Sequence, residues 1–208
     1  MGRQLSALIT AGGRGSRLAS LGQEKPLVQV LGERMVDRAI STALAVKGVR
    51  TVYVSTSHWA PRTEDHVRKG PAKVVRTAGK GYVEDLHDIM SVIEEDDVLI
   101  MPSDMPLVRS ASLDEVIAEY YRLGMPSLTV TIDPQVLRDK GLAVTHTEVM
   151  DGREVTFCGV SVLDRKEMLK DDYIAGSYIF MSGEEFAINV NTPSDLDIAE
   201  AALKRRER

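Results

Sequence analysis

A glycine-rich run at residues 10–18 has the composition of a loop that binds an anion. It reads Thr-Ala-Gly-Gly-Arg-Gly-Ser-Arg-Leu and follows a short apolar run. Glycine lets backbone N–H groups approach and wrap around a phosphate. Residues 11–25 contain three cations, Arg14, Arg17 and Lys25, and one acid, in a chain of net charge −5. This local basic bias predicts an anionic ligand.

The spacing in this run excludes two well-known phosphate loops. A Walker A loop needs Gly-Lys followed by Ser or Thr at a set distance, and neither this run nor the Gly-Lys-Gly at 79–81 supplies it. The dinucleotide-binding fingerprint matches through Gly13 and Gly15, but Leu18 stands where its third glycine would be. The remaining alternative is a flexible surface turn. Three glycines and three cations after a predicted first strand favour the binding loop.

A carboxylate follows one of the most apolar runs of the chain. Asp104 comes shortly after Val98-Leu99-Ile100-Met101, which has the length of a buried strand. At the carboxyl end of a strand it could hold Mg²⁺ against phosphate oxygens. An aspartate in this position is also a common cap or turn former. Its combination with the basic loop favours the functional interpretation.

Two other loops have side chains or glycines suited to ligand contact. In the run Asn-Val-Asn-Thr-Pro at 189–193, Asn191 could complete a metal or substrate shell, or could simply turn the chain before the last helix. The run at 77–86 contains Gly79 and Gly81, which permit close approach of a ligand between a predicted strand and helix.

The elements that must position these loops alternate along the chain. Apolar runs of strand length are separated by longer segments with helical periodicity. This alternation predicts an α/β fold with a mostly parallel central sheet and helices on both faces. We expect strands at 6–10, 51–54, 73–75, 98–101 and 128–132, and helices at 35–46, 82–94, 113–123 and from 192 onward.

The region 142–162 departs from the alternation. Asp151-Gly152 between two short extended runs is a hairpin signal. We expect a small β-hairpin insertion that forms one wall of a cleft. Beyond it, Thr192 is the expected N-cap of the last helix, with Pro193 in the first turn and Asp195 near the positive end of the helix dipole.

Bulk properties exclude several classes of protein. A length of 208 residues favours one domain over 1–208. The net charge of −5 argues against broad nucleic-acid binding. Cys158 is the only cysteine, so no internal disulfide is expected, and no apolar run approaches the roughly 20 residues of a membrane span. The histidines lack zinc-ligand spacing. We expect a cytoplasmic protein.

Taken together, these motifs resemble those of the nucleotidyltransferases of the molybdenum-cofactor guanylyltransferase and sugar-nucleotide pyrophosphorylase type. The Gly-Gly-x-Gly-x-Arg signature is present at 12–17 and is followed by Lys25-Pro26. The Asp-x-Pro element stands at 104–106 and the closing Asn-x-Asn-Thr-Pro at 189–193. Their order covers nearly the whole chain, and the resemblance implies a Rossmann-like fold.

A narrower resemblance is to the archaeal adenosylcobinamide-phosphate guanylyltransferases. It depends on the Gly-Lys-Gly-Tyr-Val-Glu-Asp-Leu at 79–86, on Thr56-Ser57 and on the small size of the chain. These enzymes join GMP from GTP to the phosphate of adenosylcobinamide phosphate and release pyrophosphate in cobalamin biosynthesis. The resemblance implies GTP and a phosphorylated corrinoid as substrates and Mg²⁺ as cofactor.

The resemblance also implies roles for individual residues. Arg17 would bind the departing pyrophosphate, Lys25 would neutralise the α-phosphate, and Asp104 would hold Mg²⁺ with Asn191 as a weaker candidate ligand. The nucleotide-binding set would be Ala11, Gly12, Gly13, Gly15, Ser16, Arg17 and Lys25 around the phosphates, with Thr56, Thr77 and Gly81 in the nucleoside pocket.

Three alternatives remain at this point. The chain could transfer GMP to molybdopterin or CMP to a related cofactor. It could instead be a non-catalytic nucleotide-sensing module, although a sensor would have no need of Arg17, Lys25 and Asp104 together. The hairpin region or an edge strand could also support a homodimer.

Overall fold

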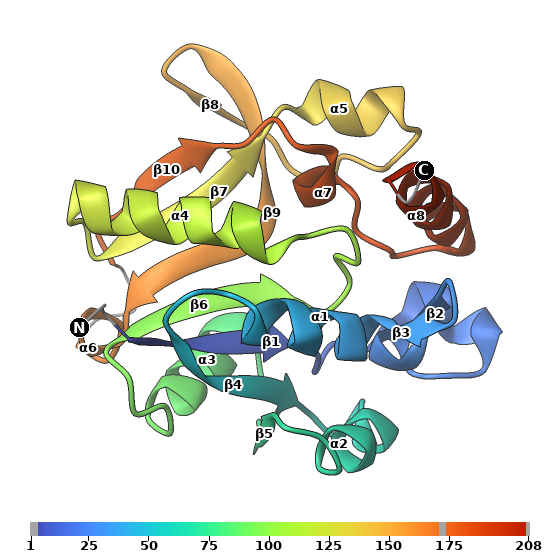
Figure 1. Ribbon diagram of the computed structural model, residues 1–208, viewed down its shortest axis with the longest axis horizontal. Helices are drawn as coiled ribbons and strands as arrows, with labels where there is room; N and C mark the ends of the chain where they lie inside the picture. Colours follow the sequence, from blue (N-terminus) through green and yellow to red (C-terminus); the bar gives the residue numbers. More distant parts are fainter. Residues whose placement is uncertain (1–3, 171–173, 207–208) are drawn as a thin grey trace.

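The computed structural model describes residues 4–170 and 174–206. A sheet of eight strands forms its centre, with helices on both faces (Figure 1). The strand order is β10-β7-β9-β6-β1-β4-β5, and β8 pairs only with β9. The strands are β1 (Leu5–Thr10), β4 (Val49–Thr56), β5 (Lys73–Arg76), β6 (Asp97–Pro102), β7 (Ser127–Ile132), β8 (Glu148–Met150), β9 (Arg153–Asp164) and β10 (Ser177–Phe180).

The predicted mostly parallel sheet is confirmed. β1 lies parallel to β4 and β6, β4 to β5, and β7 to β10, whereas β9 runs antiparallel to β6, β7 and β8. A second, two-stranded sheet pairs β2 (Gln29–Val30) with β3 (Glu33–Arg34). The helices are α1 (Met35–Leu44), α2 (Pro61–Val67), α3 (Tyr82–Met90), α4 (Ser110–Leu123), α5 (Pro134–Asp139), α6 (Arg165–Met168), α7 (Glu184–Ala187) and α8 (Pro193–Arg206).

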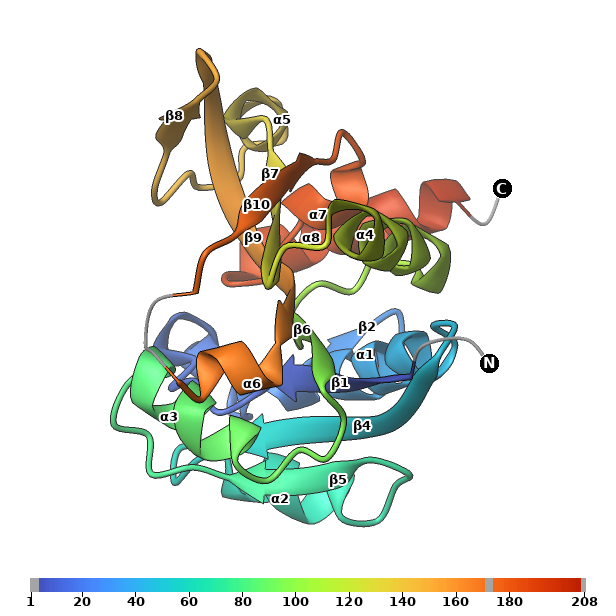
Figure 2. The same ribbon diagram turned by 90° about the vertical axis from the view of Figure 1, so that its left-hand side faces the viewer.

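Alternate residues of β1 pack on opposite faces of the sheet. Leu5 and Ile9 belong to the core cluster under α1 and α4, whereas Leu8 belongs to a second cluster with α3 and α6. Because helices cover both faces, β1 is apolar at nearly every position, as expected of a strand buried on both sides. Figure 2 shows α3 and α6 on the face opposite to α1.

The hairpin at Asp151-Gly152 forms as predicted, and both residues have positive φ, 48° and 75°. The second strand of the hairpin differs from the predicted insertion, because it belongs to the central sheet. β9 continues to Asp164 and lies between β6 and β7 at the centre of the sheet. Alternate residues of β9, namely Cys158, Val160 and Val162, are buried in the same core cluster. Their burial stabilises β9 in the sheet.

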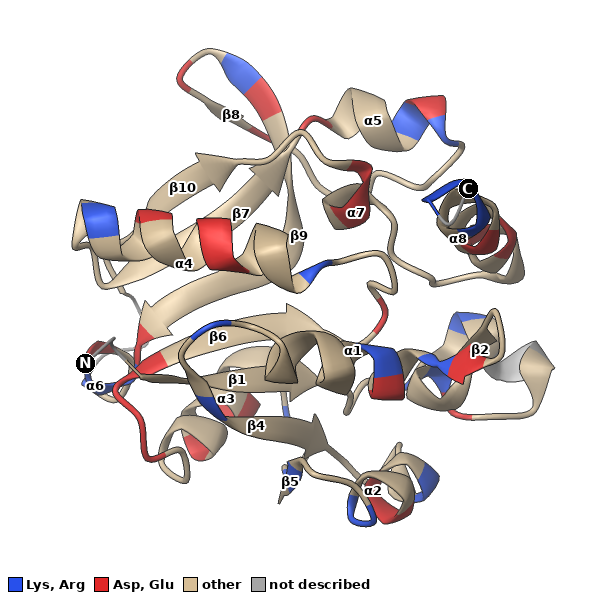
Figure 3. Cartoon of the chain, viewed as in Figure 1, with Lys and Arg blue, Asp and Glu red and all other residues tan. Residues whose placement is uncertain are grey.

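Helix α8 packs through a third apolar cluster that includes Leu18, Val190 and Leu203. This contact brings the end of the chain against the loop after β1. Figure 3 shows acidic and basic segments on α8, whose first turn contains Asp195 and whose last turn contains Lys204, Arg205 and Arg206. Within the described ranges no helix has the length and apolar character needed to cross a membrane.

Candidate active site

The glycine-rich loop after β1 lies at the carboxyl edge of the sheet, where open α/β sheets bind ligands. The Ala11 amide donates to the Ser55 carbonyl at 3.0 Å, which extends the β1–β4 pairing into the loop. The Ser57 hydroxyl donates to the Gly12 carbonyl at 2.6 Å. A Cβ on Gly12 would lie 3.2 Å from the backbone of Thr56. Glycine at this position therefore allows the loop to lie directly on the end of β4.

Gly15 brings the loop close to Lys25. Its φ is +58°, and a Cβ on it would lie 2.8 Å from the Cβ of Lys25. Lys25 opens a short 3₁₀ turn, Lys25–Leu27, in which Pro26 and Leu27 are buried. The two buried neighbours anchor the turn, so the Lys25 side chain is directed from a fixed backbone.

Four predicted polar residues meet at this edge of the sheet. Lys25 Nζ donates to the Asp104 carboxylate, with which it forms an ion pair, and to Asn191 Oδ1 at 2.7 Å. Arg17 Nη2 donates to the same Asn191 oxygen at 3.2 Å. The Lys25 and Asp104 side chains are only 17% and 14% exposed. We call Arg17, Lys25, Asp104 and Asn191 the polar cluster.

The N-terminus of α8 holds Asn191 in place. The Asp195 carboxylate accepts from the amides of Asn191 and Thr192 at 2.8 Å, and the Asp195 amide donates to the Thr192 hydroxyl at 3.2 Å. This is a capping box with aspartate in the third position, and it confirms the predicted helix start. The Val190 amide donates to the Asp104 carbonyl at 2.9 Å. The cap and this bond fix Asn191 beside Asp104.

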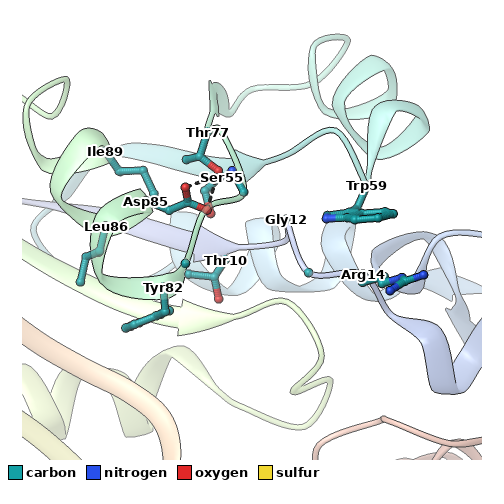
Figure 4. A pocket seen from close by; sticks show the side chains of 13 residues that line it. Thr10, Gly12, Arg14, Ser55, Trp59, Thr77, Tyr82, Asp85, Leu86 and Ile89 are labelled. Carbon is teal, nitrogen blue, oxygen red and sulfur yellow. Dashed lines mark hydrogen bonds between the residues drawn. The ribbon is translucent and has the colours of Figure 1, made fainter.

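A cavity of about 330 Å³ lies beside the glycine loop, and we call it the Tyr82 cavity. Figure 4 shows its side chains arranged around Gly12 between β4 and α3. Four residues of the predicted nucleotide-binding set line it, namely Gly12, Gly13, Thr77 and Gly81. The full lining is Thr10, Gly12, Gly13, Arg14, Ser55, Trp59, Thr77, Gly79, Gly81, Tyr82, Asp85, Leu86 and Ile89.

The Thr56 side chain does not line this cavity. Its side chain is fully buried, and its hydroxyl donates to the Glu64 carboxylate at 3.4 Å on the far side of β4. Only its backbone contributes, because the Thr56 carbonyl accepts from the Thr77 amide at 2.8 Å. Thr56 thus supports Thr77 without facing the cavity.

Asp85 is a cavity residue that the sequence analysis did not single out. Its carboxylate accepts from the Thr77 hydroxyl at 3.0 Å and from the amides of Gly79 and Lys80 at 3.1 and 3.3 Å (Figure 4). It therefore holds the 77–80 loop in shape. An acid in the first turn of a helix just after a Gly-x-Gly loop was the signal that could have found it.

In the sequence, Glu24 is the one acid among the three cations of residues 11–25. In the structure, its side chain connects two segments of the chain. Its carboxylate accepts from the amides of Arg62 and Thr63 at 2.8 and 2.7 Å and from the Thr63 hydroxyl at 2.7 Å. These bonds tie the segment before Lys25 to the start of α2. Three hydrogen-bond donors therefore occupy the Glu24 carboxylate.

A second cavity, of about 110 Å³, lies on the other side of the polar cluster and is called the Phe157 cavity. Arg17, Asn189 and Asn191 line its polar end. Its other walls come from the region 142–158 and from β7, α5, α7 and the start of α8, namely Ile132, Leu137, Leu142, Ala143, Thr145, Thr156, Phe157, Cys158, Phe186, Ala187, Thr192 and Asp195. The predicted role of the hairpin region as one wall of a cleft is confirmed for its inner part.

The thiol in this wall is inert. Cys158 is buried, and burial raises its pKa to about 12. The thiolate is the nucleophilic and metal-binding form of cysteine, so at neutral pH this residue is unsuited to either role. Cys158 therefore belongs to the packing of β9.

The donor set of the polar cluster fits a hard divalent cation. The Asp104 carboxylate and the amide oxygen of Asn191 are oxygen donors, and the Asn189 amide lies 3.5 Å from Asp104 Oδ1. Mg²⁺ is typically bound by one or two carboxylates together with substrate phosphates. Among the described residues no group of three or more His, Cys, Asp or Glu could hold a metal by itself. A cation at Asp104 would therefore need phosphate oxygens to complete its shell.

The fold and this site define a nucleotidyltransferase. The family model of the MobA-like NTP transferase domain matches residues 7–149, and the chain belongs to that family. Over 97% of its length, the chain is 27% identical to the adenosylcobinamide-phosphate guanylyltransferase of Methanocaldococcus jannaschii, of which the match covers 98%.

Solved structures show the same fold. A CMP:2-keto-3-deoxy-manno-octonic acid synthetase complexed with CTP superposes with a TM-score of 0.75 at 18% identity, covering 98% of this chain and 99% of that one. A 4-diphosphocytidyl-2C-methyl-D-erythritol synthase from Anaerococcus prevotii gives a TM-score of 0.67 at 15% identity, covering 98% and 97%. The predicted α/β nucleotidyltransferase fold is confirmed.

Proposed function

We propose that this nucleotidyltransferase moves GMP from GTP to the phosphate of adenosylcobinamide phosphate and releases pyrophosphate. The observation that carries the proposal is the polar cluster, which lines the Phe157 cavity through Arg17 and Asn191 and contacts the glycine loop through Lys25. One cavity follows the glycine loop and suits a nucleotide, and the other extends from Arg17 and Asn191 toward the hairpin. The match to the guanylyltransferase over almost the full length of both chains supports the choice of substrates.

The chemistry explains why cations dominate the site. An oxygen of the acceptor phosphate attacks the α-phosphorus of GTP, and the bond to the β-phosphate oxygen breaks. Two unit charges about 4 Å apart repel by roughly 4 kcal/mol at an effective dielectric of 20. Left uncompensated, this repulsion would cost about a thousandfold in rate. Positioning and charge neutralisation therefore supply the catalysis, and no protein nucleophile is needed.

Each member of the polar cluster has a role in this proposal. Lys25 neutralises the α-phosphate and the incoming acceptor phosphate. Arg17 contacts the departing pyrophosphate from the cluster side, and Asn191 orients both cations through its side-chain oxygen. Around the phosphates, the backbones of Ala11, Gly12, Gly13, Gly15 and Ser16 form the cradle. Thr77 and Gly81 contact the nucleoside, and Thr56 acts on the pocket only through the Thr77 amide.

Asp104 would hold Mg²⁺ together with phosphate oxygens of the substrate, and Asn191 would join this shell only by releasing Lys25 or Arg17 from its side-chain oxygen. When bound, the ion would neutralise developing negative charge on the phosphates. Lys25 is the ion-pair partner of Asp104. The same carboxylate thus keeps the lysine directed at the site before substrates enter.

We place the acceptor on the side of the Phe157 cavity. Its polar end begins at Arg17 and Asn191, next to Lys25, and its apolar interior is a wall for the chain that links the phosphate to the corrin ring. The cavity holds about 110 Å³, so the ring itself would remain outside, toward the β8–β9 hairpin.

A cytidylyltransferase is the alternative with a specific observation in its favour, because two solved structures with this fold are described by their names as CMP or diphosphocytidyl synthases. GMP transfer to molybdopterin is the sibling alternative. A nucleotide sensor would bind the nucleotide without transferring it.

Pyrophosphate release tests these functions directly. Purified protein is incubated with Mg²⁺ and either GTP or CTP, with adenosylcobinamide phosphate, molybdopterin or no acceptor. We expect release that requires both GTP and the corrinoid. Release with CTP would transfer the proposal to a cytidylyltransferase, and release only with molybdopterin would move it to the sibling enzyme. Tight GTP binding without release with any acceptor would support the sensor.

A further inference from the structure

Arg14 and Trp59 form a contact that the proposed roles do not use. The guanidinium carbon of Arg14 lies 4.8 Å from the centre of the Trp59 ring, and Figure 4 shows the two side chains together at the edge of the Tyr82 cavity. Both residues also line a third cavity of about 280 Å³, the Gln23 cavity. Its remaining lining is Gly13, Gly15, Gly22, Gln23, Glu24, Lys25 and Arg62. The pair therefore stands at the boundary between two cavities.

The backbone holds Trp59 in a defined position relative to the glycine loop. The Ser57 hydroxyl accepts from the Trp59 amide at 3.1 Å and donates to the Gly12 carbonyl at 2.6 Å. The His58 ring packs against Trp59 with a centroid distance of 4.3 Å. One hydroxyl thus links the loop that carries Arg14 to the turn that carries Trp59. The backbone segments that carry the two side chains are therefore joined before any ligand binds.

The Gln23 cavity has an excess of positive charge. Arg14, Lys25 and Arg62 line it against a single acid, Glu24. The Glu24 carboxylate already accepts three hydrogen bonds from Arg62 and Thr63. Among the residues that the structure describes, Arg14 has no carboxylate within ion-pair distance, so its ring contact with Trp59 leaves the guanidinium N–H donors available to an anion.

We propose that Arg14, held by Trp59, binds the β- and γ-phosphates of the nucleoside triphosphate and the pyrophosphate that leaves. The Tyr82 cavity and the Gln23 cavity share Gly13, Arg14 and Trp59. A nucleotide bound in the Tyr82 cavity would therefore extend its phosphates over the glycine loop toward the Gln23 cavity. Guanidinium groups bind phosphates through paired N–H donors. Lys25, in the wall of the Gln23 cavity, marks its junction with the polar cluster.

Trp59 is a positioning residue in this proposal. An exposed arginine samples many rotamers, and contact with an aromatic face restricts them while leaving the charge intact. The inference requires nucleotide binding but neither a particular base nor a particular acceptor. It can therefore fail while the proposed corrinoid function stands, and the reverse also holds.

Calorimetric titration separates the phosphate contacts from the nucleoside contacts. GTP and GMP, or CTP and CMP if CTP is the better ligand, are titrated into wild type, Arg14→Ala and Trp59→Ala. We expect Arg14→Ala to weaken triphosphate binding by about tenfold to a hundredfold, the scale of a charge-assisted hydrogen bond. Monophosphate binding should change by less than about twofold, within the measured spread for surface substitutions.

The Arg14→Ala/Trp59→Ala double variant and Arg122→Ala complete the test. Trp59→Ala should weaken triphosphate binding by about two- to tenfold, and the double variant should be no weaker than Arg14→Ala alone, because Trp59 acts through Arg14. Arg122→Ala, which removes one charge from an exposed pair on α4, is the matched control for net charge. Equal losses for tri- and monophosphate, or no loss in Arg14→Ala, would overturn the proposal. Additive losses in the double variant would overturn the positioning role of Trp59.

Discussion

Lys25 and Asp104 form an ion pair across the carboxyl edge of the sheet, although 79 residues separate them in the chain. Asn191 accepts from the same lysine at 2.7 Å and comes from the far end of the sequence. Three segments that are remote in sequence thus converge on one ammonium group. We propose that the acceptor phosphate and the α-phosphate meet at this ammonium group.

Removing that cation should abolish most of the activity. We expect Lys25→Ala to lower kcat by roughly 10² to 10³, the scale for the loss of one transition-state charge contact. The measurement is acceptor-dependent pyrophosphate release at saturating substrates. Lys47→Ala, which removes an 88% exposed lysine that pairs with Asp114, is the control for loss of positive charge. Near-normal turnover in a folded Lys25→Ala variant would remove Lys25 from the proposed chemistry.

A methyl group on Gly15 should disturb Lys25 indirectly. Alanine at 15 would bring its Cβ to 2.8 Å from the Lys25 Cβ, so the 25–27 turn would have to shift. Gly124→Ala is the matched control, because Gly124 at the end of α4 also has positive φ, +64°, but a Cβ there would meet nothing within 4 Å. Both variants should lose about 1–2 kcal/mol of folding free energy from the positive φ, measured by urea unfolding. Gly15→Ala should lose more because of its close contact with Lys25, and only Gly15→Ala should lose turnover. Equal turnover in the two would show that the approach of Gly15 to Lys25 is unimportant.

The divalent cation requirement should depend on Asp104. We expect chelation to stop nucleotidyl transfer, and Asp104→Asn to raise the Mg²⁺ concentration for half-maximal activity by about tenfold or more. The variant also leaves Lys25 without its ion-pair partner, so its melting temperature should be measured alongside. Asp114→Asn changes a carboxylate on α4 that pairs with exposed Lys47 and serves as the control. An unchanged Mg²⁺ dependence in Asp104→Asn would exclude Asp104 as the ligand.

Glu64 should make stability depend on acid pH. The Arg68 guanidinium, bonded to its carboxylate at 2.7 Å, holds the pKa of Glu64 below the ordinary value of 4.5, and nearby Arg76 acts in the same direction. A carboxyl with a depressed folded-state pKa stabilises the fold above its unfolded pKa. That contribution is lost as pH falls through the folded-state value.

The corresponding variant is Glu64→Gln. At pH 7 its free energy of unfolding should be about 0.5–1 kcal/mol below that of wild type, because Glu64 is buried but its partners Arg68 and Arg76 are 59% and 57% exposed and solvent screens the pairs. The difference should shrink as pH is lowered below 4.5. Urea unfolding of both proteins at a series of pH values measures it. A difference that stays constant from pH 7 to acid would show that the charge of Glu64 does not stabilise the fold.

The sequence by itself determined the features that depend on local chemistry. Apolar runs of strand length predicted β1, β4, β6 and β7, because strands buried on both faces need apolar side chains at successive positions. Positive φ at Asp151 and Gly152 follows from the turn preference of that pair, and the α8 start follows from the capping residues. The glycine loop and its cations were evident from composition alone.

Tertiary structure decided which side chains meet. Thr56 ends β4, and the strand's alternation turns its hydroxyl to Glu64 and away from the Tyr82 cavity. The pairing of Arg14 with Trp59 depends on the packing of the glycine loop against the turn after β4. The place of β9 at the centre of the sheet depends on partners in β6 and β7. The periodicity of a sequence indicates which residues are buried and which lie in turns. It does not indicate which residues are neighbours, because strand order and register decide which distant segments of the chain meet.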